Sequence, residues 1–133
     1  MTDKDERSLD TFVHKCLRRI LKIYWPMRVT NDEVRRIANI EKISILIRKR
    51  RWRNLGHIMR RDINSHQRIA LRWTPEGKRN RGRPKETYRR TVEREMKLVN
   101  LTSWQHAAGV AQDRDAWRNL VDDPILHSRE KRT

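Results

Sequence analysis

Apolar side chains recur at helical spacing along much of the chain. Between Ser8 and Pro26 they fall three or four positions apart, so they share one face of a predicted helix. Ser8 is suited to cap the start of this helix and Pro26 to stop it. Lysine and arginine fill positions between the apolar ones, which predicts a basic face opposite the buried one. The apolar positions are Leu9, Phe12, Val13, Cys16, Leu17, Ile20, Leu21 and Tyr24.

The same spacing predicts helices further along the chain. Thr30 or Asn31 can cap a short helix, because their side-chain oxygens accept hydrogen bonds from backbone N–H groups. Thr102 and Gln105 have the spacing of a capping box, and either two helices or one helix broken near residues 112–113 should follow. The predicted helices lie within residues 30–39, 41–60, 86–99 and 100–124.

The middle of the chain is less regular. Residues 62–77 alternate in part like a strand but also fit a helical turn, and we favour a short helix. Residues 74–84 hold two of the four prolines and two of the four glycines, which marks the main non-regular segment. We therefore expect a mostly α-helical single domain with a basic, glycine- and proline-containing loop between helices. Its expected parts are a disordered N-terminus at 1–7, a helical segment with a basic helix at 8–62, a basic loop or linker at 63–85, C-terminal helices at 86–123 and a flexible tail at 124–133.

Charge changes the picture of what such a fold is for. Lysine and arginine number 33 against 17 aspartates and glutamates, a formal net charge of +16. Only 35% of the residues are apolar, below the roughly 45–50% of ordinary domains, so the core should be thin. Self-repulsion of this size disfavours compaction unless a polyanion neutralises it, and nucleic acid is the natural partner.

The positive charge is concentrated in two blocks. Residues 48–61 contain seven basic side chains and no acidic one, and residues 68–94 contain ten basic and three acidic ones. Such surfaces bind phosphates and release counterions, so the affinity should fall steeply with salt. Trp52 and Trp73 lie among arginines, which suits stacking on exposed bases, although we favour a core position for each.

A short motif lies inside the second block. Arg81, Gly82, Arg83 and Pro84 resemble the core of the AT-hook, which lies in the minor groove of A·T-rich DNA. Glycine lets the backbone approach the groove floor, and the arginines enter a groove of enhanced negative potential. Alternatively, Gly82 supplies a turn and Pro84 opens the next helix at its first position. The two roles are compatible.

No set of residues indicates catalysis. The five histidines are scattered without metal-ligand spacing, and Asp122 and Asp123 have no third acid nearby. Neither a serine–histidine–acid set nor a phosphate-binding glycine loop is present. The single cysteine, Cys16, excludes an internal disulfide and fits the apolar stripe. We expect no enzyme activity, no metal and no cofactor.

The expected location follows from the termini and the basic runs. The first residues are polar and partly acidic, which is unlike a secretory signal, and no apolar run approaches the roughly 20 residues that a membrane span needs. Residues 48–51 and 78–85 are basic runs of the kind found in nuclear-import signals. We expect a nuclear or cytoplasmic protein that is not secreted, with neither a membrane nor a small-molecule substrate as partner.

Four separate blocks of sequence together resemble a known family. They are KCLRRILKIYWPMRVTNDE, RKRRWRNLGHIMRR, ALRWTPEGKRNRGRPKETYRRTVEREMK and LTSWQHAAGVAQDRDAWRNLV, in this order. In order and spacing they are similar to the region downstream of the reverse-transcriptase domain in LINE-type, non-LTR retrotransposon polyproteins of animals. The likeness covers about residues 9–122. It implies descent from an endonuclease and reverse-transcriptase polyprotein, whose tail helps to hold template RNA or target DNA.

The resemblance also implies which residues contact nucleic acid. It points to the basic helix at 48–53 and to four residues of the following loop, while Trp104, Asp113, Arg114 and Trp117 of the closing block are expected to pack. With neighbouring basic residues of the second block, the candidate contacts are Arg48, Lys49, Arg50, Arg51, Arg53, Lys78, Arg79, Arg81, Arg83, Lys85, Arg89 and Arg90.

The chain departs from the family in one decisive respect. It has no YADD-like polymerase motif and no endonuclease, so polymerase activity cannot reside in it. The predicted function is therefore binding of RNA or DNA through phosphates, without catalysis. The alternatives are an autonomous AT-hook-like minor-groove binder, a tail that docks on an acidic protein, and a remnant without function.

Overall fold

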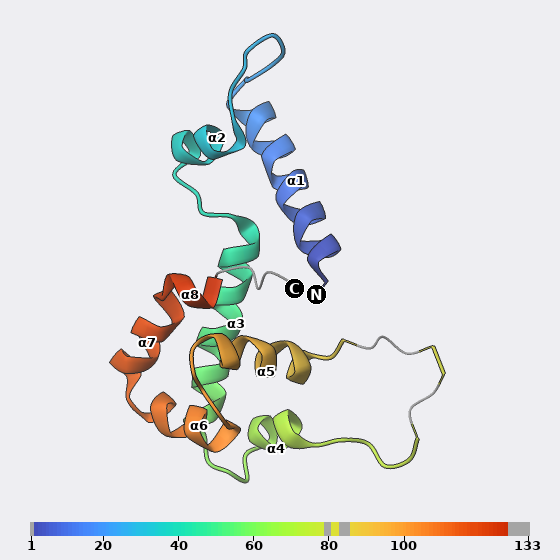
Figure 1. Ribbon diagram of the computed structural model, residues 1–133, viewed down its shortest axis with the longest axis vertical. Coiled ribbons are helices and arrows are strands. Elements are labelled where there is room, and N and C mark those ends of the chain that lie inside the picture. The colour runs from blue at the N-terminus through green and yellow to red at the C-terminus, as the bar shows by residue number, and fades with distance from the viewer. Residues whose placement is uncertain (1, 79–80, 83–85, 128–133) are drawn as a thin grey trace. The chain divides into compact units, whose positions relative to one another are not determined.

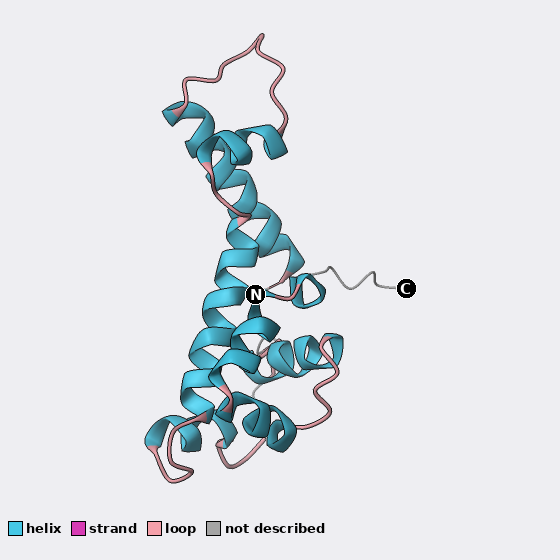
Figure 2. Ribbon diagram, turned by 90° about the vertical axis from the view of Figure 1, so that its left-hand side faces the viewer, coloured by secondary structure: helices cyan, strands magenta, loops and turns pink. Residues whose placement is uncertain are grey.

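The computed structural model describes residues 2–78, 81–82 and 86–127, and across these residues it is helical, without a strand (Figure 1, Figure 2). The mostly α fold predicted from the sequence is confirmed. None of the described helices is long and apolar enough to cross a membrane. The helices are α1 (Asp3–Ile20), α2 (Asn31–Ala38), α3 (Ile43–Met59), α4 (His66–Arg72), α5 (Tyr88–Leu98), α6 (Trp104–Gln112), α7 (Arg114–Asp122) and α8 (Pro124–His127).

The helices gather into two compact units. Unit 1 comprises Met1–Arg48 and unit 2 comprises Lys49–Thr133, so the boundary falls within α3. In unit 1, α1 and α2 lie side by side and bury Leu17, Ile23 and Val34 between them and the loop that joins them (Figure 1).

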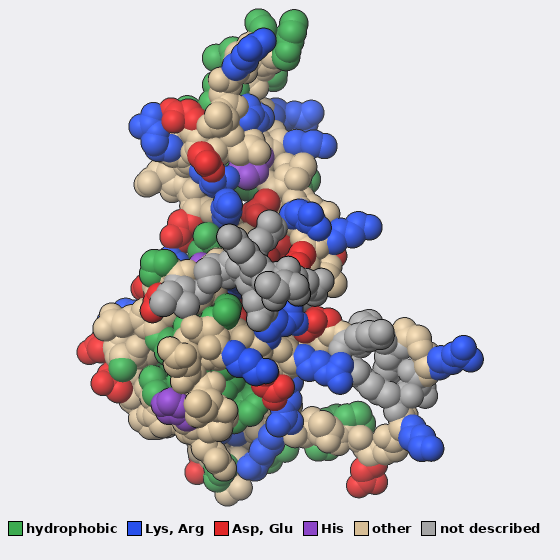
Figure 3. Space-filling view, in the orientation of Figure 1, with side chains coloured by type: hydrophobic (Ala, Val, Ile, Leu, Met, Phe, Trp, Pro, Cys, Tyr) green, Lys and Arg blue, Asp and Glu red, His purple; other side chains and the backbone are tan. Residues whose placement is uncertain are grey.

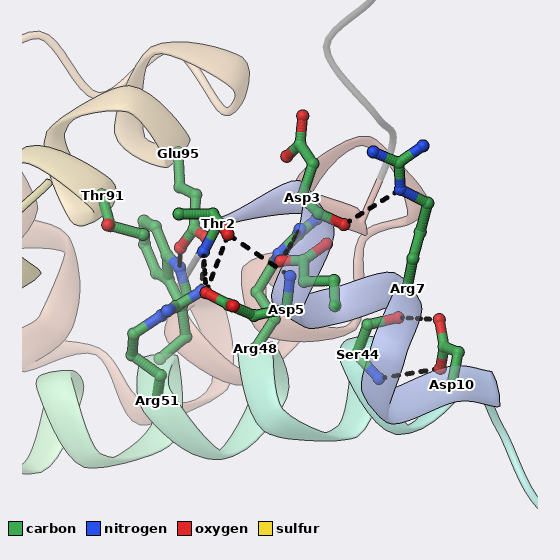
Figure 4. A network of polar contacts seen from close by, with 12 residues as sticks. Thr2, Asp3, Asp5, Arg7, Asp10, Ser44, Arg48, Arg51, Thr91 and Glu95 are labelled. Carbon is green, nitrogen blue, oxygen red and sulfur yellow. Dashed lines mark hydrogen bonds and ion pairs between the residues drawn. The ribbon is translucent and has the colours of Figure 1, made fainter. Parts of the chain in front are cut away.

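Helix α1 begins earlier than predicted. Thr2, not Ser8, is its N-cap: the Thr2 hydroxyl accepts a hydrogen bond from the Asp5 backbone N–H, and the Asp5 carboxylate accepts one from the Thr2 N–H at 2.8 Å (Figure 4). This capping box, with acidic side chains in the first turn, stabilises the positive end of the helix dipole. The hydrogen bond from the Thr2 backbone also lowers the pKa of Asp5. The expectation of a disordered stretch at 1–7 is wrong for the described residues 2–7.

The core of unit 2 is built on two tryptophans. Trp52 of α3 and Trp117 of α7 stack with their ring centroids 5.4 Å apart, and the Trp117 Nε1–H donates to the Trp52 carbonyl at 2.9 Å. Both side chains are buried, so the predicted core position of Trp52 is confirmed. The apolar side chains around them are Leu55, Met59, Val92, Met96, Leu101, Ala107, Ala111, Val121 and Leu126.

The C-terminal helices follow the predicted pattern with two corrections. The predicted break near residues 112–113 is confirmed, since Asp113 caps α7 by accepting from the Asp115 and Ala116 N–H groups. The cap of α6 is Ser103, which accepts from the His106 N–H, so the capping box predicted at Thr102 is wrong by one residue. A flexible tail from 124 was also expected, yet Pro124–His127 form α8 and Leu126 is fully buried.

The helices that flank the basic loop are short and locally capped. The ambiguous stretch is helical over α4, as favoured, and Ser65 caps it by accepting from the Arg68 N–H. Helix α5 begins at Tyr88, and its cap is Thr87, which accepts from the Arg90 N–H. The prediction for Pro84 falls outside the described residues.

Gly56 provides the first test, because α3 and α7 meet at this position. A Cβ placed on Gly56 would lie 2.2 Å from Nε1 of Trp117, whose indole is buried and stacked on Trp52, so the packing would have to shift. We expect Gly56→Ala to lower the free energy of unfolding of unit 2 by about 2 kcal/mol or more, as overpacking does. Urea denaturation followed by tryptophan fluorescence measures this change.

Gly109→Ala is the matched control. A Cβ at this exposed position of α6 meets no atom within 4 Å, so alanine should stabilise the helix by roughly 0.5–1 kcal/mol. If Gly56→Ala were as stable as the unsubstituted protein, the described contact between α3 and α7 would be incorrect.

Candidate nucleic-acid interface

Much of the basic run on α3 is paired with carboxylates of the chain itself. Within unit 1, Arg48 contacts Glu6 of α1 at 3.3 Å, and their side chains are only 12% and 13% exposed. Within unit 2, Arg51 donates to Glu95 of α5 at 2.5 Å, and these side chains are 12% and 8% exposed (Figure 4). Arg48 and Arg51, both predicted nucleic-acid contacts, are thus turned into the protein.

Glu95 is the centre of the polar contacts in the core of unit 2. Its second carboxylate oxygen accepts a hydrogen bond from the Trp52 Nε1–H at 2.6 Å, in addition to the bond from Arg51. A buried carboxylate needs such partners, because an isolated charge loses several kcal/mol of hydration. In the sequence, the only indication of this buried role is that Glu95, an acidic residue, occupies an apolar position of the predicted helix at 86–99.

The outer side of α3 retains cations at the surface. Lys49 and Arg53 approach the Asp122 carboxylate at 3.5 and 3.8 Å, but the Lys49 side chain is only 16% exposed, whereas that of Arg53 is 61% exposed. Arg50 is exposed, and no carboxylate among the described residues forms an ion pair with it. The structure therefore divides the predicted basic helix into an inner set, Arg48 and Arg51, and an outer set that includes Arg50 and Arg53.

Other arginines of the two charge blocks bind backbone carbonyls. Arg60 donates to the Ala111 carbonyl at 3.0 Å, Arg68 to the Met59 carbonyl at 3.0 Å, and Arg72 to the Ile63 carbonyl at 3.1 Å. These carbonyls lie at or beyond helix ends, where backbone acceptors lack helical partners. From the sequence we counted these side chains as part of the basic surface, but in the structure they help to fix the ends of α3 and α6.

The segment between α4 and α5 carries cations on its surface. Lys78 and Arg81 are exposed, whereas Arg79, Arg83 and Lys85 lie outside the described residues. Gly82 has a φ of +87°, a conformation that glycine adopts readily, so its predicted role in a turn is confirmed. Figure 3 shows lysine and arginine side chains over α4 and α5 and along the described part of this segment.

A wide groove opens beside this segment, entirely within unit 2. Its volume is about 1160 Å³, and Ile58, Ala70 and Leu71 contribute apolar surface to its lining. Trp73, which we expected in the core, lines the groove and is 66% exposed, and Tyr88 lines it and is 46% exposed. The cationic side chains of the groove are Lys78, Arg89 and Arg90.

Arg89 is held in a defined position at the groove. Its Nε donates to the Glu93 carboxylate at 3.1 Å, and its guanidinium lies over the Trp104 ring, 5.7 Å from the centroid. The Trp104 Nε1–H also donates to Glu93, at 2.9 Å, and this bond, followed by the one from Arg89, lowers the pKa of that carboxyl. Trp104 therefore packs, as the resemblance implies, and it orients a cation.

Tyr88 stays neutral at physiological pH. Burial of its phenol raises its pKa; the positive charge of Arg51 has a smaller, lowering effect, and the negative charge of Glu95 a smaller, raising one. Its ring therefore presents an uncharged aromatic surface to the groove, together with Trp73.

The Arg51–Glu95 pair provides the second test. Glu95→Gln leaves Arg51 without its charge partner in a site where both side chains are about nine-tenths buried. We expect a loss of about 3–5 kcal/mol from the free energy of unfolding, the usual cost of breaking a buried pair. Denaturant titration of the full chain measures it.

The matched control is Glu93→Gln, on the same helix. Its ion pair with Arg89 is roughly 40% exposed on both sides, so its loss should cost at most about 1 kcal/mol. Equal effects of the two substitutions would contradict the distinction between an internal and a surface pair.

Comparison with known proteins identifies no relative of this chain. No protein-family model matches the sequence, and neither a curated protein nor a solved structure is significantly similar to it. The likeness to LINE-type tails therefore rests on the four quoted blocks and stays a prediction.

Proposed function

We propose that the chain binds nucleic acid through unit 2 by neutralising phosphates, and that it has no catalytic activity of its own. Unit 2 contains 22 lysines and arginines against 10 aspartates and glutamates, so it carries +12 of the net charge of +16. Charge of one sign at this density favours a polyanion as partner, through counterion release.

The observation that carries the proposal is that most acidic side chains near the groove already form ion pairs with arginines of the chain. Residues 68–94 contain three acids. Glu86 pairs with Arg94 at 2.6 Å, and Glu93 pairs with Arg89 at 3.1 Å. Burial alone would raise the pKa of Glu86, but hydrogen bonds from Thr91 and Arg94 outweigh it and lower the pKa. Two of the three acids thus form ion pairs with arginines of α5. Lys78 and Arg81, by contrast, remain exposed.

The nature of the ligand comes from the resemblance. A tail of a LINE-type reverse transcriptase would hold template RNA or target DNA while an upstream enzyme copies the RNA. Contacts of this kind go mainly to phosphates, so sequence selectivity should be modest. The basic runs at 48–51 and 78–85 extend the proposal to a nuclear location.

A second candidate is a minor-groove binder that uses the RGRP motif. Arg81 is exposed next to a glycine with positive φ, which allows the backbone to approach a surface closely. This candidate predicts a preference for A·T-rich over G·C-rich duplex that alanine at Arg81 and Arg83 abolishes. The main proposal predicts similar affinity for both duplexes.

Charge reversal tests the main proposal. We expect Lys78→Glu with Arg81→Glu to weaken binding to A·T-rich duplex, G·C-rich duplex and structured RNA alike. Each phosphate contact contributes about 0.9 to the slope of log affinity against log salt for duplex DNA, so the slope should become shallower by about 2. Fluorescence anisotropy of the full chain at several salt concentrations measures both effects.

Two further double variants complete this test. Lys97→Glu with Arg114→Glu changes the net charge of unit 2 equally at exposed positions outside the groove, and it should have a smaller effect. Arg50→Glu with Arg53→Glu probes the outer side of α3, and unchanged affinity would exclude that side from the interface. If the unsubstituted protein failed to bind DNA and RNA at low salt, the proposal would be wrong.

A further inference from the structure

We propose that the groove beside α4 and α5 binds unpaired nucleobases, so that the chain prefers single-stranded nucleic acid over duplex. The inference rests on the proposed function, because it names the form of nucleic acid that the same surface takes. The inference concerns contacts with bases. The phosphate contacts proposed above can be made to paired and unpaired strands alike.

The exposed aromatic side chains are the first step. Trp52 and Trp117 are 0% and 2% exposed, whereas Trp73 and Tyr88 are 66% and 46% exposed and line one groove. An aromatic ring left open to water beside cations suits stacking on bases, which is tolerant of sequence because every base has a π-face. In duplex those faces are covered by neighbouring base pairs, so only unpaired bases can use the rings.

The rest of the lining fits the same ligand. Ile58, Ala70 and Leu71 give the groove apolar surface for a base, and Lys78, Arg89 and Arg90 supply positive charge for the adjoining phosphates. Two acids also line it, Glu76 and Glu93, but Glu93 already accepts hydrogen bonds from Arg89 and Trp104. The lining is therefore complementary to a chain that alternates flat apolar groups with negative charges.

The size of the groove favours an extended ligand. Its volume of about 1160 Å³ exceeds the roughly 300–1,000 Å³ of typical small-molecule pockets. Leu71 and Arg89 also line a second hollow of about 270 Å³, which Met59, Trp104 and Ala108 help to form. The two hollows thus share part of their lining, and an extended, flexible strand suits such a surface better than a rigid duplex does.

The test compares single-stranded and duplex oligonucleotides of equal length on the full chain. Fluorescence anisotropy with poly(dT), poly(U) and a blunt duplex should show tighter binding of the single strands by the unsubstituted protein. Trp73→Ala and Tyr88→Ala should each weaken single-strand binding by about fivefold or more, as loss of base stacking does, with the salt slope unchanged. Duplex binding should change by less than about twofold, because the phosphate contacts remain.

Trp25→Ala is the matched control. Trp25 is 93% exposed and belongs to unit 1, so its removal takes away an exposed indole without touching the groove. It should leave single-strand binding unchanged. Circular dichroism and thermal unfolding confirm that each variant is folded, and Trp73→Tyr, which keeps an aromatic ring, should retain most of the affinity.

The outcomes separate this inference from the proposed function. Binding of single strands and duplex with equal affinity, or equal losses for Trp25→Ala and Trp73→Ala, would overturn the groove as a base site while leaving phosphate binding intact. Absence of binding to every oligonucleotide at low salt would overturn the proposed function, and the inference with it.

Discussion

The structure of unit 2 depends on one buried carboxylate. The inner side of α3 presents both Arg51 and Trp52 to the core, and neither can be buried without a partner for its polar atoms. Glu95 accepts a hydrogen bond from each, with one carboxylate oxygen on the Arg51 guanidinium and the other on the Trp52 indole N–H. Because Trp52 is held in this way, it can stack on Trp117, whose own N–H is satisfied by the Trp52 carbonyl. A single acid on α5 therefore fixes how α3, α5 and α7 pack.

The same pairing decides where positive charge is available. The arginines of a helical run are not all exposed at the surface, because a helix that packs against others turns some of its positions inward. On α3 those inward positions include Arg48 and Arg51, and their charges are neutralised by Glu6 and Glu95. Cations that remain exposed in unit 2 include Arg50 and Arg53 on the outer side of α3 and Lys78 and Arg81 on the segment that follows α4. Net charge alone gives no hint of this division.

Local patterns in the sequence were sufficient for most helices but not for the tertiary contacts. Helix α3 and the break before α7 follow from apolar spacing and an aspartate cap. The start of α1 was missed because it is stabilised by Thr2 and Asp5 without apolar periodicity, and α8 was missed because its buried Leu126 packs against distant residues. Arg51 and Glu95 are 44 positions apart, so no local pattern could pair them.

Trp52 and Trp73 show most clearly why the site needed the structure. Both directly follow an arginine in the sequence, and both were expected in the core, yet only Trp52 lies there. Trp52 is in the middle of a long helix with helices on its inner side, whereas Trp73 follows the last residue of α4, where the chain leaves regular structure. Because Trp73 lies where the helix ends, no neighbouring helix among the described residues packs over its side chain. The transition from helix to loop thus places an aromatic ring beside exposed cations, and the proposed recognition of unpaired bases rests on this arrangement.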